Sequence, residues 1–343
     1  RNVSDRLFSL SKEPTFGGSL FTRCISIPRI QFIVLLLLST FLFTIKLDDG
    51  GMMGYDECFY AQKSKEMVAS GDWLTQTYAG ETCHQNPWLH MWIMAASVKV
   101  FGVSEWCALF PTCLQSILMV LRTFLLVQWL TDRPWVGMMS ASFLLLSDFF
   151  FKYARKAHMD HMMALMFLLA MMMYIAGRKR NQIWFLPMGL AIGLAILTKS
   201  VLGLMPAAVI VAHIILGREW RVLGKPLFWL SALVALAVGC SWYIFEYVNF
   251  RGEFVQEHFE WQVLSRSVFD DVSGQGFAIG AFLLGRLRHL YAFLKDAHVW
   301  LLMAVLGAVF SVLPAKDPGR SSGSAPGERL LLILWLVIPV ILV

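Results

Sequence analysis

Long apolar segments alternate with short polar ones along most of this 343-residue chain. A transmembrane helix needs about 20 mainly apolar residues, whereas the strands of a membrane barrel alternate apolar and polar positions. The apolar segments here are unbroken, as from Phe32 to Leu38, and so predict helices. The predicted spans lie at about 30–45, 108–130, 135–151, 161–176, 183–198, 200–216, 227–246, 298–314 and 330–343. This pattern predicts an all-α integral membrane protein, a polytopic helical bundle of about nine spans.

Two segments between the first and second spans have helical patterns of their own. Trp88–Phe101 is apolar but only 14 residues long, which predicts an interfacial or re-entrant helix rather than a crossing. From Tyr55 to Ser70, key side chains recur at spacings of three and four residues, which predicts a helix there.

Composition supports the membrane assignment and removes several other classes. The chain is 57% hydrophobic and 15% charged, with a mean hydropathy of +0.62. These values exclude a soluble enzyme, a disordered chain and a disulfide-rich secreted scaffold, because no soluble core of this size holds so much apolar sequence. The net charge of +6 is first a topology signal in such a protein, so we expect no nucleic-acid partner.

The distribution of Lys and Arg predicts which loops are cytoplasmic, because cytoplasmic loops carry an excess of them. With the N-terminal segment 1–29 inside, the cytoplasmic loops contain 15 Lys or Arg against six acids. Residues 30–343 then form the transmembrane domain, and the two long loops, 46–107 and 247–296, lie outside. The chain begins with Arg1 and stops at Val343 inside an apolar run, so we expect one or both of the native termini to lie further out.

Candidate chemistry gathers on the predicted outer side. Asp56 and Glu57 would lie in the first turn of the Tyr55–Ser70 helix, where acids also serve simply as helix caps. Asp160 lies in the short turn between two spans, where it could pair with Arg155 or Lys156. Lys199 lies in another such turn, suited either to binding a phosphate or to reaching the membrane interface.

Seven motifs in order resemble the polyprenyl-phosphate-sugar-dependent membrane glycosyltransferases, such as the lipid A aminoarabinose transferases and the protein O-mannosyltransferases. They are Asp56-Glu57 with Tyr60-Ala61, Lys65-Glu66-Met67, Ser70-Gly71-Asp72-Trp73-Leu74, Gly80-Glu81 with Asn86-Pro87, Phe101 to Trp106, Tyr153-Ala154-Arg155 with Asp160, and Gly193 to Lys199. Further likeness follows at Trp242-Tyr243, Glu257-His258 and Arg266.

The resemblance implies the C-type glycosyltransferase fold and an inverting transfer of a sugar from a polyprenyl phosphate to a lipid, glycan or protein acceptor. It implies a multi-pass protein of the bacterial inner membrane with its site facing the periplasm or exterior. Asp56 would be the general base, with Glu57 and Asp160 as supporting acids. The substrate-binding residues would be Arg155, Lys199, Arg266, Gln85, Asn86 and Tyr60.

This chain departs from the family pattern at one motif and in its length. Where relatives usually have Glu-Lys-Pro, the chain has Gln85-Asn86-Pro87, so both charges are absent. If a divalent metal ion takes part, His84 and His258 are the candidate ligands. Relatives also continue past the equivalent of Val343, so part of the family fold is expected to be missing.

Two other kinds of function remain open from the residues. The neutral Gln85-Asn86 pair would suit a catalytically silent relative acting as a membrane subunit. A lipid or solute transporter would instead show charges at mid-membrane on broken helices. Arg122 is the one clear charge of that kind in the sequence. Cys58 and Cys83 share the first outer loop and could form a disulfide.

Overall fold

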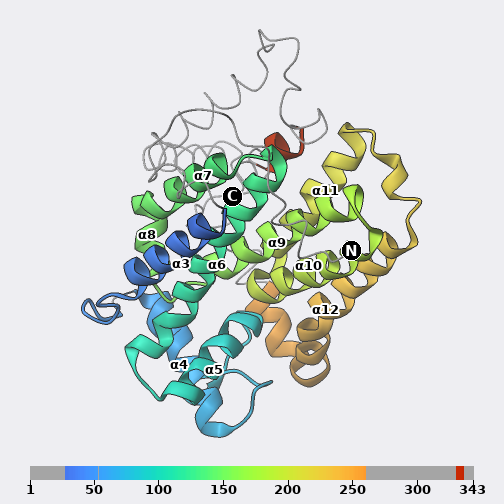
Figure 1. Cartoon of the computed structure of the whole chain (residues 1–343). Helices are drawn as coiled ribbons and strands as arrows, with labels where there is room; N and C mark the ends of the chain where they lie inside the picture. The colour runs from blue at the N-terminus through green and yellow to red at the C-terminus, as the bar shows by residue number, and fades with distance from the viewer. Residues whose placement is uncertain (1–27, 53, 260–329, 336–343) are drawn as a thin grey trace, which may run out of the picture.

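The computed structural model describes residues 28–52, 54–259 and 330–335, and in these ranges the chain is mostly helical (Figure 1). The elements are α3 Pro28–Thr44, α4 Tyr55–Ser70, β1 Thr77–Tyr78, β2 Glu81–Thr82, α5 Leu89–Phe101, α6 Glu105–Thr131, α7 Pro134–Leu146, α8 Asp148–Ala154, α9 Asp160–Lys179, η1 Gln182–Trp184, α10 Phe185–Lys199, η2 Ser200–Leu204, α11 Met205–Leu216, η3 Trp220–Val222 and α12 Pro226–Phe254.

Four stretches of the described chain are long and apolar enough to cross a membrane, namely Glu105–Thr131, Asp160–Lys179, Gln182–Leu216 and Pro226–Phe259. They match predicted spans, and α3 covers the predicted first span at 30–45 with 17 residues. The predicted span at 298–314 and most of the one at 330–343 lie outside the described residues. The total of about nine therefore stays a prediction.

Gln182–Leu216 doubles back on itself and forms two antiparallel helices, as the sequence predicts for 183–198 and 200–216. The reversal begins at Ser200, whose φ of 51° lies in the left-handed region. Gly203 then packs on α10 so tightly that a Cβ there would lie 2.4 Å from backbone atoms of Ala195 and Ile196. No side chain fits in that space, so glycine is required at this turn.

The predicted span at 135–151 is broken, although its two helices together are long and apolar enough to cross a membrane. It divides into α7 and α8, which are bent by 67° relative to each other. The break has a local cause, because Ser147 has extended backbone angles and its hydroxyl accepts a hydrogen bond from the N–H of Phe150, capping α8.

The first outer loop folds into the two helices that the sequence predicts, α4 and α5, with a small hairpin between them. Gly71 ends α4 with a φ of 75°. Glu66 of α4 then anchors the hairpin by accepting hydrogen bonds from the Thr77 hydroxyl (2.6 Å) and from the N–H groups of Ala79 and Gly80. These bonds also hold the pKa of Glu66 below its usual value, although partial burial opposes them. The hairpin leads directly into the segment 83–86.

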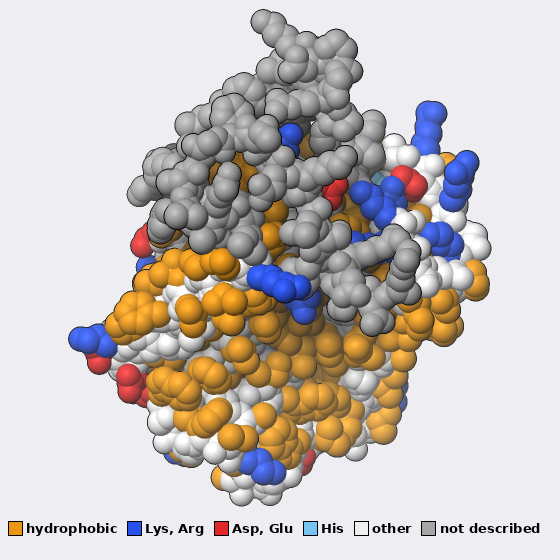
Figure 2. Space-filling model, viewed as in Figure 1, with side chains coloured by type: hydrophobic (Ala, Val, Ile, Leu, Met, Phe, Trp, Pro, Cys, Tyr) orange, Lys and Arg blue, Asp and Glu red, His pale blue; other side chains and the backbone are white. Residues whose placement is uncertain are grey.

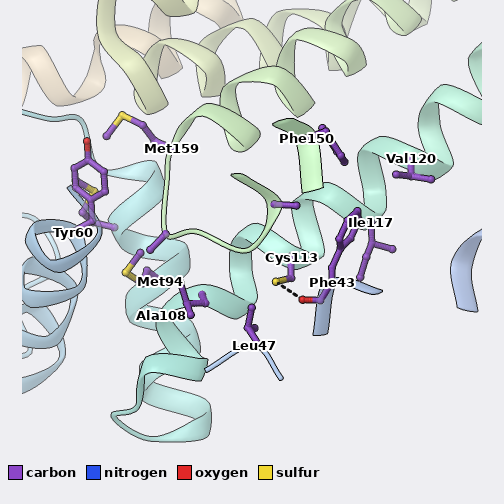
Figure 3. Packing of buried hydrophobic residues seen from close by; sticks show 14 of the residues in the cluster. Phe43, Leu47, Tyr60, Met94, Ala108, Cys113, Ile117, Val120, Phe150 and Met159 are labelled. Carbon is purple, nitrogen blue, oxygen red and sulfur yellow. Dashed lines mark hydrogen bonds between the residues drawn. The ribbon is translucent and has the colours of Figure 1, made fainter. Parts of the chain in front are cut away.

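The helices pack around buried hydrophobic clusters. One cluster joins α3, α4, α5, α6 and α8 and includes Phe43, Tyr60, Met94, Cys113 and Met159 (Figure 3). A second packs α9, α10 and α11 together. Between α10 and α12 small residues bring the backbones together, since a Cβ at Gly189 would lie 2.1 Å from the carbonyl oxygen of Ser231.

Side-chain contacts show which helix ends lie together. Arg155, after α8, donates hydrogen bonds to carbonyls at the end of α3, and Lys199 at the end of α10 pairs with Asp160 at the start of α9. We call this the loop end, because α4 and α5 also lie there (Figure 1). At the opposite end Arg178 of α9 pairs with Glu219. Figure 2 shows a broad hydrophobic surface between the two ends, with basic side chains gathered near the α11–α12 connection.

Candidate functional site

Asp160 and Lys199, two of the predicted site residues, form an ion pair at the loop end. The Lys199 ammonium donates to Oδ1 of Asp160, and Nδ1 of His158 lies 4.0 Å from Oδ2. The antiparallel packing of α9 and α10 places the first residue of one helix beside the last residue of the other. The expected alternative, a pair with Arg155 or Lys156, is therefore wrong. The side chains of Asp160 and Lys199 are 51% and 32% exposed, so solvent or a ligand can reach both.

Arg155 binds backbone carbonyl groups at the C-terminal end of α3. Its guanidinium donates to the carbonyl oxygens of Leu42 (3.2 Å), Ile45 (2.7 Å) and Lys46 (2.5 Å). These are carbonyls that the end of a helix leaves without a partner, so the side chain acts as a C-terminal cap. A role in phosphate binding would require Arg155 to leave these carbonyls. Arg266, the other predicted arginine of the site, lies outside the described residues.

His258 connects the segment after the hairpin to the turn between α10 and α11. Its Nδ1 lies 3.0 Å from the backbone oxygen of Gln85, and its Nε2 lies 3.1 Å from the hydroxyl of Ser200. That hydroxyl also lies 2.5 Å from the hydroxyl of Tyr243. Because a carbonyl only accepts, Nδ1 carries the proton and Nε2 accepts from Ser200. His258 is fully buried, and its bonds hold Ser200 in its left-handed conformation.

Gln85 and Asn86, which replace the charged family residues, are held through their backbone. The Gln85 carbonyl accepts from His258, and the Asn86 carbonyl accepts from Nε2 of Gln76 at 2.7 Å. Asn86 is buried and Gln85 is half-buried. The segment is thus fixed in place independently of the two side chains.

His84 lies among three glutamates of the α12 region. Its Nδ1 lies 2.7 Å from Oε2 of Glu246, its backbone N–H donates to Glu257 at 2.8 Å, and its Nε2 lies 3.6 Å from Glu253. Burial opposes protonation of this imidazole. The Glu246 hydrogen bond and the charges of the three glutamates outweigh burial and raise the pKa of His84 above its ordinary 6.5.

Asp56, Glu57 and Tyr60 lie on the first two turns of α4. Glu57 is buried, and its carboxylate accepts from the N–H of Gly54 at 3.0 Å, so it caps the helix. Asp56 is half-buried. Tyr60 is one turn further along the same face as Asp56 and contacts the ring of His90, with centroids 5.4 Å apart. In Figure 3 Tyr60 and Met159, the residue before Asp160, lie on the same side of the hydrophobic cluster.

Lys63 is a buried charge that the sequence analysis did not select. Its side chain is fully buried, and the polar group that its ammonium interacts with most closely is the thiol of Cys83, a weak hydrogen-bonding partner. Burial lowers the pKa of Lys63 from its ordinary 10.5, while Cys83, Glu257 and Glu246 oppose that shift. A signal was present, because Lys63 lies between Phe59 and Met67 on the apolar face of α4.

The candidate metal ligands do not converge. Within residues 28–52, 54–259 and 330–335, no group of three or more His, Cys, Asp or Glu side chains is arranged to hold a metal ion. His258 uses both ring nitrogens for hydrogen bonds, and His84 uses one. Cys58 and Cys83 are both free thiols, so the disulfide that they could have formed is not present.

An open cavity of about 490 Å³ lies beside His84. It is lined by Glu81, Thr82, His84, Glu253, Gln256 and Glu257. The lining therefore combines the hairpin and the residue after it with the last turns of the α12 region, which continues beyond a kink at Phe250.

The helical membrane architecture, with polar residues gathered at one end, agrees with comparisons to known proteins. Residues 85–245 match the family model described as dolichyl-phosphate-mannose-protein mannosyltransferase. A relative from Aquifex aeolicus, named only as an uncharacterized protein, is 28% identical over 231 residues, which are 66% of this chain and 46% of the relative. An undecaprenyl phosphate-alpha-4-amino-4-deoxy-L-arabinose arabinosyl transferase from Pectobacterium carotovorum is 23% identical over 330 residues, covering 91% of this chain and 54% of the relative.

The crystal structure of ArnT from Cupriavidus metallidurans bound to undecaprenyl phosphate superposes with a TM-score of 0.62 and 23% identity, over 90% of this chain and 59% of that chain. The chain therefore has this fold. Its resemblance to the polyprenyl-phosphate-sugar-dependent glycosyltransferases of the C-type fold, first seen in the motifs, is confirmed. The chain spans about half the length of the curated relatives that it matches.

Proposed function

We propose that this protein is an inverting membrane glycosyltransferase that takes a sugar from a polyprenyl-phosphate carrier at the outer face of a bacterial inner membrane. The acceptor is a lipid, glycan or protein. The observation that carries the proposal is the ion pair between Asp160 and Lys199, because it joins two site residues of the family pattern at the loop end of a fold shared with ArnT.

The chemistry needs a base for the acceptor and positive charge for the departing phosphate. Lys199 lies at the end of α10, and its side chain is 32% exposed. Its ammonium can therefore supply that charge to a phosphate. Asp160 keeps the ammonium in place until a phosphate competes for it. We assign Asp56 as the base because it is half-buried and lies on the same face of α4 as Tyr60. Tyr60 contacts the ring of His90, and His90 interacts electrostatically with Asp160. Glu57, in contrast, is committed to the helix cap.

The outer-face location rests on the charge distribution. The end opposite the candidate site carries Arg178, Lys179 and Arg180 and faces the basic connection between α11 and α12. By the positive-inside rule that end is cytoplasmic, which leaves the loop end outside.

The test is transfer of radiolabelled sugar from a polyprenyl-phosphate donor pool into membrane lipid, glycan and protein. The protein, its Asp56→Asn variant and a control Asp49→Asn variant are compared at equal amounts. Asp49 is an exposed acid of the same loop that pairs with Lys46 at 3.2 Å, and such surface pairs contribute little. We expect transfer with the protein and the control, and a loss of at least about 100-fold with Asp56→Asn. Equal transfer by all three would remove Asp56 as the base.

A second candidate function is a catalytically silent subunit. The neutral Gln85 and Asn86, fixed by their backbone, favour it, because two charges of the family pattern are lost without disturbing the local fold. Binding of polyprenyl phosphate without any transfer in the same assay would support this alternative.

A further inference from the structure

Arg122 is a charged residue inside a membrane-spanning helix, and the proposed function does not use it. It lies within the candidate span Glu105–Thr131 and is half-buried. Among residues 28–52, 54–259 and 330–335 its guanidinium has no hydrogen bond, ion pair or ring contact. A guanidinium within a span is costly unless it meets an anion or reaches the membrane surface. The donors of Arg122 are therefore open to an anion.

The face of α6 that carries Arg122 is apolar and uncovered toward the loop end. Side chains at spacings of three and four residues share one face of a helix. On this face they are Leu114, Leu118, Arg122, Leu125 and Trp129. Leu114 is 45% exposed and Leu118 is 37% exposed, so the described chain leaves this part of the helix open to lipid.

A second arginine joins the same face near the other end of α6. Arg180 follows α9, is exposed, and places its guanidinium 4.7 Å from the ring centroid of Trp129. The contact is possible because α6 and α9 pack together, with Leu126 of α6 in the buried cluster of α9 (Figure 1). Trp129 lies two helical turns beyond Arg122, about 10.5 Å along the axis. A long arginine side chain reduces that separation by extending toward the membrane surface.

We propose that this face of α6 binds an anionic membrane phospholipid, with the headgroup phosphate between Arg122 and Arg180 and the acyl chains along Leu118 and Leu114. Guanidinium groups match phosphate oxygens in both charge and geometry. Tryptophan is enriched at the level of lipid headgroups, which is the place that Trp129 takes between the two arginines. The exposed leucines favour a lipid over a soluble phosphate, because a soluble phosphate would use the guanidinium groups alone.

The usual excess of basic residues in cytoplasmic loops does not account for this arrangement. That excess explains Arg180 and the exposed Arg133, which lie in connections between helices. It does not explain Arg122, which lies inside a span. The acid nearest to this site in sequence is Asp132, and within the described chain it forms no ion pair with Arg122 or Arg180. Both arginines are therefore available to one phosphate.

The experiment labels the full protein in phosphatidylcholine nanodiscs with a phosphatidylglycerol that carries a diazirine in one acyl chain. Mass spectrometry maps the labelled peptides, and unlabelled phosphatidylglycerol is titrated as competitor. We expect the label on α6, and little label from a phosphatidylcholine with the same diazirine. The competition constant should rise about fivefold in Arg122→Gln and in Arg180→Gln, the factor that one basic residue near an anionic lipid contributes. Arg122→Lys keeps the charge and should retain most of the affinity.

Arg251→Gln is the matched control, because Arg251 is an exposed arginine that lies over an aromatic ring elsewhere, 5.2 Å from the centroid of Tyr247 on α12. It should leave the labelling of α6 unchanged. Unfolding temperatures establish that the variants are folded, and the exposed Arg180 provides the test should Arg122→Gln not fold.

Four results would overturn the inference. They are equal labelling of α6 by the phosphatidylcholine probe, an unchanged competition constant in the folded glutamine variants, and competition by soluble glycerol 3-phosphate as strong as that by the lipid, which would assign the arginines to a free phosphate. The fourth is crosslinking of α6 to α6 between two copies in place of lipid labelling, which would show that a second copy covers this face. The assay needs no sugar transfer, so its result is independent of the proposed function.

Discussion

Lys199 at the end of α10 donates a hydrogen bond to Asp160 at the start of α9, although the two residues are 39 positions apart. Each is a helix-terminal residue, so the pair closes the loop end of two antiparallel helices. The pair is also reachable from solvent, with Asp160 half exposed. Its energetic contribution and its chemical role can therefore be separated.

Replacement of Lys199 by Met should strongly reduce sugar transfer while leaving the fold nearly intact. Exposed ion pairs typically contribute 1 kcal/mol or less, so we expect a loss of stability of about that size. If Lys199 holds the departing phosphate as proposed, loss of its cation should lower sugar transfer by about 100-fold or more. Lys199→Arg should retain part of the activity. Thermal unfolding and the transfer assay check both, and a large fall in the unfolding temperature would show that the pair is structural.

Replacement of Lys63 by Met should stabilise the protein near neutral pH. A fully buried ammonium whose nearest polar partner is a thiol is costly, and Met has a similar length. Because burial lowers the pKa of Lys63, its cost is present at low pH and is relieved as pH rises toward the unfolded value of 10.5. The gain from Lys63→Met should therefore shrink between pH 7 and pH 10. Lys65→Met, at the exposed next-but-one position, should show no such trend.

The stability contributed by His84 should have the opposite pH dependence. The glutamates raise its folded pKa above the ordinary 6.5, so its contribution is full below pH 6.5 and is lost as pH rises through the folded value. The difference in unfolding temperature between the protein and His84→Gln should therefore be largest near pH 5.5 and smallest near pH 8.5. A difference that grows with pH would contradict the assigned hydrogen bond to Glu246.

Gly189→Ala should destabilise the packing of α10 on α12. The added Cβ would lie 2.1 Å from the backbone oxygen of Ser231, so the two helices must move apart, and overpacking of this kind typically costs about 1–3 kcal/mol. Gly252→Ala is the matched control, because a Cβ there meets nothing within 4 Å. Unfolding temperatures of the two variants in the same detergent give the comparison.

Ser200 allows a comparison of backbone strain with side-chain bonding. Ser200→Gly removes the bonds to Tyr243 and His258 but relieves the positive φ, whereas Ser200→Ala removes the same bonds and keeps the strain. We expect Ser200→Ala to be the less stable variant by about 1 kcal/mol. Equal stability of the two would show that the backbone relaxes when the hydroxyl is lost.

Sequence reasoning identified the elements well where local signals agree. The bounds of α4 follow from its repeated spacings and from Gly71, which can adopt the left-handed cap conformation. The reversal between α10 and α11 follows from a lone lysine between two apolar segments. The bend at Ser147 was missed because the short polar pair Ser147-Asp148, which carries the capping signal, lies within a long apolar segment.

Contacts between distant segments were the hardest to predict. Arg155 and Lys156 are next to Asp160 in sequence, yet Arg155 caps α3 and the acid pairs with Lys199. Lys63 interacts with Cys83 and with Glu246 and Glu257, which follow it by about 20 and 190 positions. Spacing within one segment carries no information about such partners, and so it identified candidate residues but not their neighbours.

The Arg155 cap links the first described helix to a residue made much later in synthesis. The carbonyl of Ile45 receives its hydrogen bond from a side chain 110 residues further along the chain. While a ribosome is still adding those residues, this carbonyl cannot receive the hydrogen bond from Arg155 and has to bond to water instead. Final seating of α3 is therefore a late step of biogenesis, and a nascent chain that stops before Arg155 would lack the cap on the carbonyls of Leu42, Ile45 and Lys46.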